Sequence, residues 1–103
     1  MAATHLTPET FQAEILEGKK TALIDFWADW CGPCKMLGPV IDQLSDELSG
    51  QAMVGKLNID DHGSLAQQYG VMSIPTVIAF RDGKEIGRVV GLVPKARLEE
   101  LLK

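Results

Sequence analysis

The sequence contains two cysteines, Cys31 and Cys34, and two residues separate them. Thiols at this spacing can bind a metal, form a structural cross-link or exchange reversibly with other disulfides. A cross-link over so short a loop removes little entropy from the unfolded chain, so a structural staple is a weak explanation. A zinc site needs further ligands, and His5 and His62 are far apart in the sequence. We therefore expect no metal, and a reversible redox reaction in a reducing compartment.

Length and composition further limit the range of possible functions. The chain has 103 residues, a net charge of −4 and 46% hydrophobic residues, which suits one packed domain over residues 1–103. The acidic balance argues against a basic surface for nucleic acid. No apolar run is long enough to span a membrane, and the first residues lack the features of a secretory signal. We expect a cytoplasmic protein that binds neither nucleic acid nor membranes.

The hydrophobic pattern predicts a strand directly before the cysteines and a long helix directly after them. Residues 21–28 are nearly all apolar, which is typical of a strand buried on both faces. From Leu37 to Leu48, apolar residues recur at helical spacing, and Gly50 is the expected end of this helix. Further strands are predicted over residues 52–59, 76–80 and 85–90, and shorter helices from Pro8, over residues 64–69 and from Pro94.

The order of these elements predicts an α/β fold. A strand, a long helix and a second strand imply a parallel pair with a right-handed crossover. The Asp82-Gly83 turn adds an antiparallel hairpin near the end of the chain. The central sheet should therefore be mixed, with helices on both faces.

The junction between strand and helix gives the two thiols different expected roles. Cys31 would lie at the helix N-terminus, where free backbone N–H groups and the helix dipole stabilise a thiolate. The thiolate is the nucleophile in disulfide exchange, so Cys31 is the expected attacking residue. Cys34, one turn further along and more buried, would resolve the mixed disulfide. Pro33 fits the first helical turn, and Gly32 leaves room for another backbone. Two inert buried cysteines are the alternative.

The segment from Trp27 to Lys35, with Trp-Cys-Gly-Pro-Cys at its centre, resembles the active site of the thioredoxin family. The resemblance continues through residues 56–60, 74–76, 80–83 and 90–91, so it covers almost the whole chain. It implies a thioredoxin fold and a general protein-disulfide reductase that carries electrons. It also implies diverse disulfide-containing substrates, a thioredoxin reductase as electron donor, a monomer, and no cofactor beyond the redox-active Cys31–Cys34 disulfide.

Two charged residues interrupt predicted strands. Asp25 has apolar neighbours on both sides, and burial there would raise the pKa of its carboxyl group. The resemblance implies that Asp25 lies beneath the active site and assists proton transfer involving Cys34. It also implies that Lys56 pairs with Asp25 and tunes its proton affinity. The alternatives are a carboxylate that reaches solvent and an ordinary exposed lysine.

The resemblance also implies a cis peptide bond before Pro75, although cis bonds are uncommon even before proline. The backbone before Pro75 would pair with a bound substrate chain as an added strand, and Gly91 would allow a close approach beside the cysteines. The expected docking surface comprises Trp30, Gly32, Pro33, Ile59, Ile74, Pro75, Val90, Gly91 and Leu92. Close relatives commonly have a small residue just before the position of Ile74, where this chain has Met72-Ser73. We expect this difference to affect contacts with partners rather than the chemistry.

Two other functions fit part of the pattern. A thiol oxidant or disulfide isomerase with this fold usually has His between its cysteines and a secretory signal, and Gly32-Pro33 argues against it. A redox-inert binding subunit would use the fold only as a partner surface, and the intact cysteine pair argues against that as the sole role. The redox potential tests the first alternative, and replacement of Cys31 tests the second.

Overall fold

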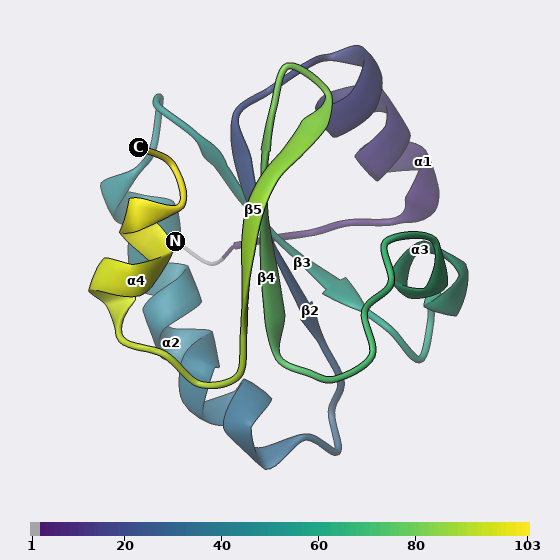
Figure 1. Cartoon of the computed structure of the whole chain (residues 1–103), viewed down its shortest axis with the longest axis vertical. Helices are drawn as coiled ribbons and strands as arrows, with labels where there is room; N and C mark the ends of the chain where they lie inside the picture. The colour runs from purple at the N-terminus through teal and green to yellow at the C-terminus, as the bar shows by residue number, and fades with distance from the viewer. Residues whose placement is uncertain (1–2) are drawn as a thin grey trace.

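The strand before the cysteines, β2 (Ala22–Trp27), lies at the centre of a five-stranded sheet in the computed structural model, which describes residues 3–103 (Figure 1). The strand order is β1-β3-β2-β4-β5. β2 pairs in parallel with β3 and antiparallel with β4, so the sheet is mixed, as predicted. The other strands are β1 (Thr4–His5), β3 (Met53–Asn58), β4 (Thr76–Arg81) and β5 (Lys84–Val90).

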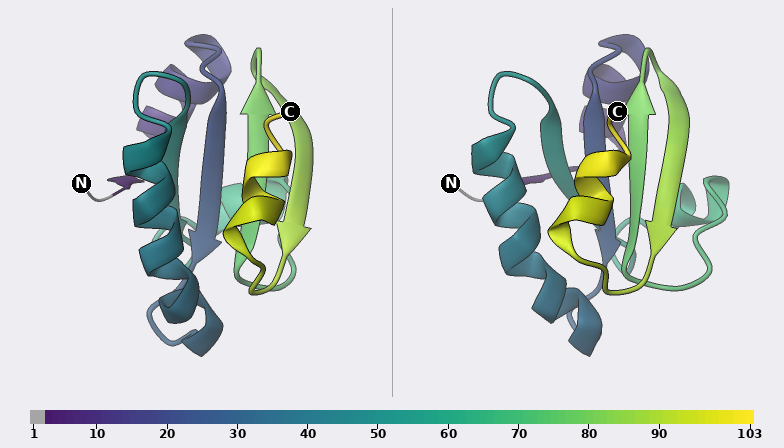
Figure 2. Two further views of the ribbon diagram at one scale, coloured as in Figure 1. Left: turned by 90° about the vertical axis from the view of Figure 1, so that its left-hand side faces the viewer. Right: turned by 60° about the vertical axis from the view of Figure 1, so that its left-hand side comes forward.

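Helices cover both faces of this sheet (Figure 2). One face carries α2 (Gly32–Glu47) and α4 (Lys95–Glu100). The other carries α3 (Gly63–Gln68) and α1 (Pro8–Phe11), which continues into a π-helical segment (Gln12–Glu17). None of the helices within residues 3–103 is long and apolar enough to cross a membrane.

The alternation of side chains along β2 divides the core between the two faces. Successive strand residues point to opposite sides of a sheet, so Leu23 and Ile24 enter different clusters. Leu23 packs in the cluster beneath α2 and α4, with Leu37, Ile41, Leu44, Val54, Val77 and Leu98. Ile24 packs in the cluster beneath α1 and α3, with Phe11, Ile15, Phe26, Leu65, Ile78 and Phe80. Every second residue of β2, beginning with Leu23, therefore lies under α2.

The predicted elements form, with small differences at their ends. Thr7 caps α1, because its side chain accepts a hydrogen bond from the Thr10 N–H. The long helix ends at Glu47 with Leu48 as its C-cap, two residues before Gly50. The sequence did not indicate β1, because two residues are too few to show an alternation.

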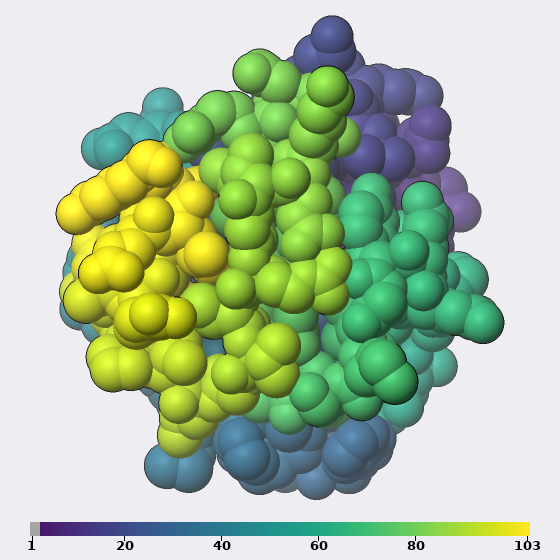
Figure 3. All heavy atoms as spheres, viewed as in Figure 1, coloured from purple at the N-terminus to yellow at the C-terminus, as the bar shows by residue number. Residues whose placement is uncertain are grey.

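The hairpin formed by β4 and β5 leaves β5 at an edge of the sheet, along the front of the molecule (Figure 3). Asp82 and Gly83 form the predicted turn, both with positive φ. A β-bulge between Ala79 and Phe80 interrupts the register of the two strands.

We predict that Ile78→Ala lowers the free energy of unfolding by about 2–5 kcal/mol, because it leaves a cavity in the core. Ile78 is completely buried on β4. The measurement is urea denaturation at neutral pH. Ile86→Ala on β5 is the control, since Ile86 is 42% exposed, and its expected loss is below about 1 kcal/mol. Equal losses for the two variants would contradict the central position of Ile78.

Candidate active site

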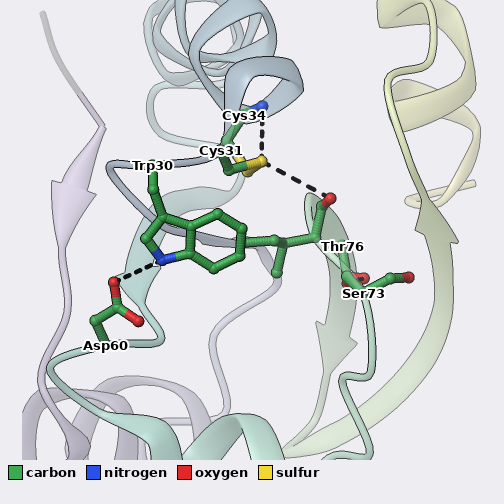
Figure 4. Close-up of a disulfide and its surroundings, with 7 residues drawn as sticks. Trp30, Cys31, Cys34, Asp60, Ser73 and Thr76 are labelled. Atoms are coloured by element: carbon green, nitrogen blue, oxygen red, sulfur yellow. Dashed lines mark hydrogen bonds between the residues drawn. A yellow bond between two sulfur atoms is a disulfide. The ribbon is translucent and has the colours of Figure 1, made fainter.

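The two cysteines lie where the chain passes from β2 into α2 (Figure 4). Cys31 is the N-cap residue of α2, and its Sγ accepts a hydrogen bond from the Cys34 backbone N–H at 3.2 Å. The two residues form a disulfide, with their Cα atoms 5.3 Å apart. Their exposed fractions are 5% and 3%. The predicted position of Cys31 at a helix N-terminus is confirmed, whereas the expected difference in burial is small.

The first turn of α2 favours negative charge on the Cys31 sulfur. Its backbone N–H groups have no partners within the helix, and the helix dipole adds to their effect. Pro33 lies in this turn, where the missing N–H breaks no helical hydrogen bond. A Cβ atom on Gly32 would meet no atom of a more distant residue within 4 Å, so the space beside Gly32 is open. In the reduced protein this helix N-terminus would stabilise a Cys31 thiolate, and the open space beside Gly32 would leave room for another chain.

The loop before β4 faces the disulfide. The peptide bond between Ile74 and Pro75 is cis, as the resemblance implied. The Ile74 carbonyl oxygen lies 3.8 Å from Cys31 Sγ, close enough to accept a hydrogen bond from the thiol in the reduced state (Figure 4). The Thr76 hydroxyl group donates a hydrogen bond to the Ser73 carbonyl oxygen at 2.6 Å, which holds the loop in place.

Apolar side chains surround the disulfide. Trp30 is exposed, and its Nε1–H donates a hydrogen bond to Asp60 Oδ2 at 2.9 Å (Figure 4). Together with Ile59, Val71, Met72, Ser73 and Ile74, the indole lines a groove of about 300 Å³. Met72 is 96% exposed at the rim of this groove, and Val90 and Leu92 are exposed as well. The sequence did not indicate Asp60 or Val71 as part of the site, because the hydrogen bond from Trp30 to Asp60 and the groove that Val71 lines arise only from the tertiary fold.

Gly91 has a conformational role rather than a packing role within the described residues. Its φ of +93° lies in the region that favours glycine. A Cβ atom at this position would meet nothing within 4 Å. Its N–H donates a hydrogen bond to the Pro75 carbonyl oxygen at 2.8 Å, so the chain after β5 supports the cis-proline loop.

Asp25 is buried beneath α2. It is 1% exposed, and its Oδ1 has no hydrogen-bond partner within residues 3–103. This burial raises the pKa of Asp25 from 3.8 to about 7, while the charge of Lys56 lowers it and that of Asp42 raises it. A carboxyl group in this setting can give or take a proton near neutral pH.

Lys56 lies beside Asp25, although the two do not form the direct ion pair that the resemblance implied. They are register partners on neighbouring parallel strands, so their side chains lie on the same face. The Lys56 ammonium group instead pairs with Asp42 of α2, at 3.6 Å between Nζ and Oδ1. Lys56 therefore acts on Asp25 through its charge, without direct contact.

Residues 2–103 match the family model described as Thioredoxin. The chain belongs to the thioredoxin family. Thioredoxin from Chlorobaculum thiosulfatiphilum is 52% identical over 89 residues, which cover 86% of this chain and 82% of that protein. Thioredoxin 1 from Synechococcus elongatus is 47% identical over 100 residues, which cover 97% of this chain and 94% of that protein. Thioredoxin from Staphylococcus epidermidis is 47% identical over 102 residues, which cover 99% and 96%.

Membership confirms the thioredoxin fold and makes the chain a protein-disulfide oxidoreductase, with Cys31 and Cys34 as its redox pair. In general terms it also means disulfide substrates and a reductase that supplies electrons. The family needs no cofactor, and residues 3–103 contain no cluster of three or more side chains that could hold a metal ion.

We predict that Asp25→Asn stabilises the protein in a pH-dependent way. The folded-state pKa of about 7 exceeds 3.8, so the folded state binds more protons between these values and stability falls as the pH rises through them. Asp25→Asn has no carboxyl group to ionise, so its stability does not fall in this way as the pH rises. Its free energy of unfolding should exceed that of the parent by on the order of 4 kcal/mol at pH 8, with the pH-dependent gain absent near pH 3.

Denaturant unfolding over a series of pH values measures this effect. The matched control is Asp29→Asn, which removes an exposed carboxylate near the same site and should leave the pH dependence unchanged. If the difference in free energy of unfolding between Asp25→Asn and the parent stayed constant from pH 3 to pH 8, the pKa of Asp25 would be the same in the folded and unfolded states, which would contradict the prediction.

Proposed function

We propose that this chain is a general protein-disulfide reductase of the cytoplasm, which carries two electrons from a thioredoxin reductase to disulfides in diverse proteins. It acts as a monomer and as a single domain over residues 1–103, without a bound cofactor and without nucleic-acid or membrane partners. The observation that carries the proposal is the Cys31–Cys34 pair at the start of α2, with Cys31 Sγ 3.8 Å from the Ile74 carbonyl oxygen.

The first step is the attack of the Cys31 thiolate on one sulfur of a substrate disulfide. A new S–S bond joins Cys31 to the substrate, and the substrate disulfide breaks and releases one thiolate. The N-terminus of α2 supports this step, because its N–H groups and dipole stabilise the thiolate that attacks.

The second step is the attack of Cys34 on the mixed disulfide. Cys34 gives its proton to Asp25, and its thiolate then attacks the Cys31 sulfur and releases the second substrate thiolate. The substrate gains two electrons and its thiolates take up protons, while Cys31 and Cys34 become a disulfide. Asp25 suits the role of proton acceptor because a carboxyl group with a pKa of about 7 is a stronger base than an ordinary aspartate. Lys56 tunes that basicity through its charge.

Substrate docking would use the loop before β4 and its apolar surroundings. The Ile74 backbone makes no hydrogen bond with another backbone group within residues 3–103, so it is available to an extended peptide. Backbone pairing tolerates many substrate sequences, which suits a general reductase. The proposed docking surface comprises Trp30, Gly32, Pro33, Ile59, Ile74, Pro75, Val90, Gly91 and Leu92, and the groove adds Met72.

We predict that the wild-type chain accelerates insulin-disulfide reduction when NADPH and a thioredoxin reductase supply electrons. Cys31→Ser should abolish turnover, because it removes the attacking sulfur. Cys34→Ser should also abolish turnover but accumulate a covalent complex with the substrate, because the mixed disulfide cannot be resolved. NADPH oxidation reports turnover, and non-reducing mass spectrometry reports the complex. A folded Cys31→Ser variant that retained full turnover would contradict the proposal.

We predict that Val90→Glu weakens the binding of protein substrates but not the reaction with small disulfides. Val90 is 56% exposed and pairs with Thr76 beside the cis-proline loop, so a charge there would oppose apolar docking. We expect KM for insulin to rise by roughly 5- to 30-fold, equivalent to about 1–2 kcal/mol, with little change in the rate of reaction with a small aromatic disulfide. The control is Ile86→Glu, four residues before Val90 on the same strand, for which we expect an unchanged KM. Equal effects of both variants would remove Val90 from the docking surface.

A further inference from the structure

Asp42 contacts both Lys56 and the beginning of the chain, and the reaction proposed above assigns it no role. Its Oδ1 lies 3.6 Å from Lys56 Nζ and accepts a hydrogen bond from the Ala3 N–H at 3.1 Å. Ala3 is buried, so this hydrogen bond anchors the Asp42 carboxylate to the segment before β1. A helix carboxylate that faces partly toward solvent is thereby held in place from two sides.

The contacts of Lys56 direct its ammonium group toward Asp42. The Nζ atom lies 5.9 Å from the centroid of the Trp27 ring, within the range of a cation–π interaction. A Cβ atom added to Gly38 would lie 3.6 Å from the same nitrogen, so α2 passes close to it. Only 16% of the lysine side chain is exposed. The ammonium group is therefore confined between Trp27, Gly38 and Asp42.

Few charged or titratable groups face Asp25. β3 contributes Lys56 and α2 contributes Asp42, and the charges of both act on the Asp25 carboxyl group. The register partner of Asp25 on β4 is the apolar Val77, and His5 on β1 lies beyond Lys56 in the sheet. Lys56 is thus the cation nearest in register to Asp25, and its only ion pair within residues 3–103 is with Asp42.

We propose that Asp42 is a positioning residue for proton transfer, which binds the Lys56 ammonium group and so prevents it from neutralising Asp25 by direct contact. This inference rests on the proposed role of Asp25 as the proton acceptor for Cys34. An ammonium group in contact with Asp25 would stabilise its ionised form and make it a weaker base. Asp42 therefore keeps Asp25 basic enough to accept the proton of Cys34.

The test is Asp42→Asn in the full-length protein. Asparagine retains an oxygen that can accept the Ala3 N–H and removes the charge that binds Lys56. We expect the pKa of Asp25, followed by NMR of its carboxyl carbon, to fall below about 7 by on the order of one pH unit. The acidic limb of the pH–rate profile for insulin reduction should move to lower pH by the same amount. Glu9→Gln is the control, because it removes an exposed charge on α1, across the sheet, and should move neither quantity.

A double-mutant cycle separates positioning from simple repulsion between carboxylates. In a Lys56→Met background, Asp42→Asn should shift the pKa of Asp25 by less than half as much as in the wild type. Equal shifts in both backgrounds would overturn the positioning role, as would an unchanged pKa in folded Asp42→Asn. Asp42→Ser gives the same measurements if the asparagine variant does not fold.

The same experiments distinguish the two proposals. Failure of Asp42→Asn to shift the pKa of Asp25 removes the role of Asp42, while wild-type turnover and its loss in Cys31→Ser still support the reductase. If Asp25→Asn leaves the pH–rate profile unchanged, the proton-transfer role of Asp25 fails, and the inference about Asp42 fails with it.

Discussion

The register between β2 and β3 is the constraint on which the rest of the site depends. It places Asp25 beside Lys56, and the crossover helix between these strands begins at Cys31 and covers both residues. A shift of β2 by one residue would exchange the side chains on its two faces. Asp25 would then point into the cluster beneath α1 and α3, away from the cysteines, and Phe26 would point toward α2. One pairing pattern therefore determines the electrostatics of the proton site and the geometry of the sulfur site together.

Local patterns in the sequence predicted most of the fold, because they follow from single elements. The apolar run of β2, the helical spacing of α2 and the Asp82-Gly83 turn each carry their own physical signature. The position of Cys31 at a helix N-terminus followed from the order of two such elements. The cis bond before Pro75 did not follow from any local pattern and came only from the resemblance to a family.

The remaining parts of the site depend on contacts between distant segments. Thirty residues separate Trp30 from Asp60, and 39 separate Ala3 from Asp42. No spacing rule connects such pairs. The resemblance to the family implied a pair between Asp25 and Lys56, and no local pattern in the sequence could show that Asp42 binds the ammonium group instead. The helix α2 thus has opposite electrostatic effects at two places. Its N-terminus favours the negatively charged form of Cys31, whereas the burial of Asp25 beneath it favours the protonated, neutral form of that carboxyl group.

The β-bulge between Ala79 and Phe80 bears on self-association. An edge strand presents unpaired N–H and C=O groups to any extended chain, including another copy of the same protein. On β5 this hazard is reduced by the bulge, which distorts the edge, and by the exposed charges of Lys84 and Glu85. At the opposite edge, β1 is only two residues long and offers little to pair with. Both edges of the sheet are therefore poor templates for pairing with a second copy of the chain.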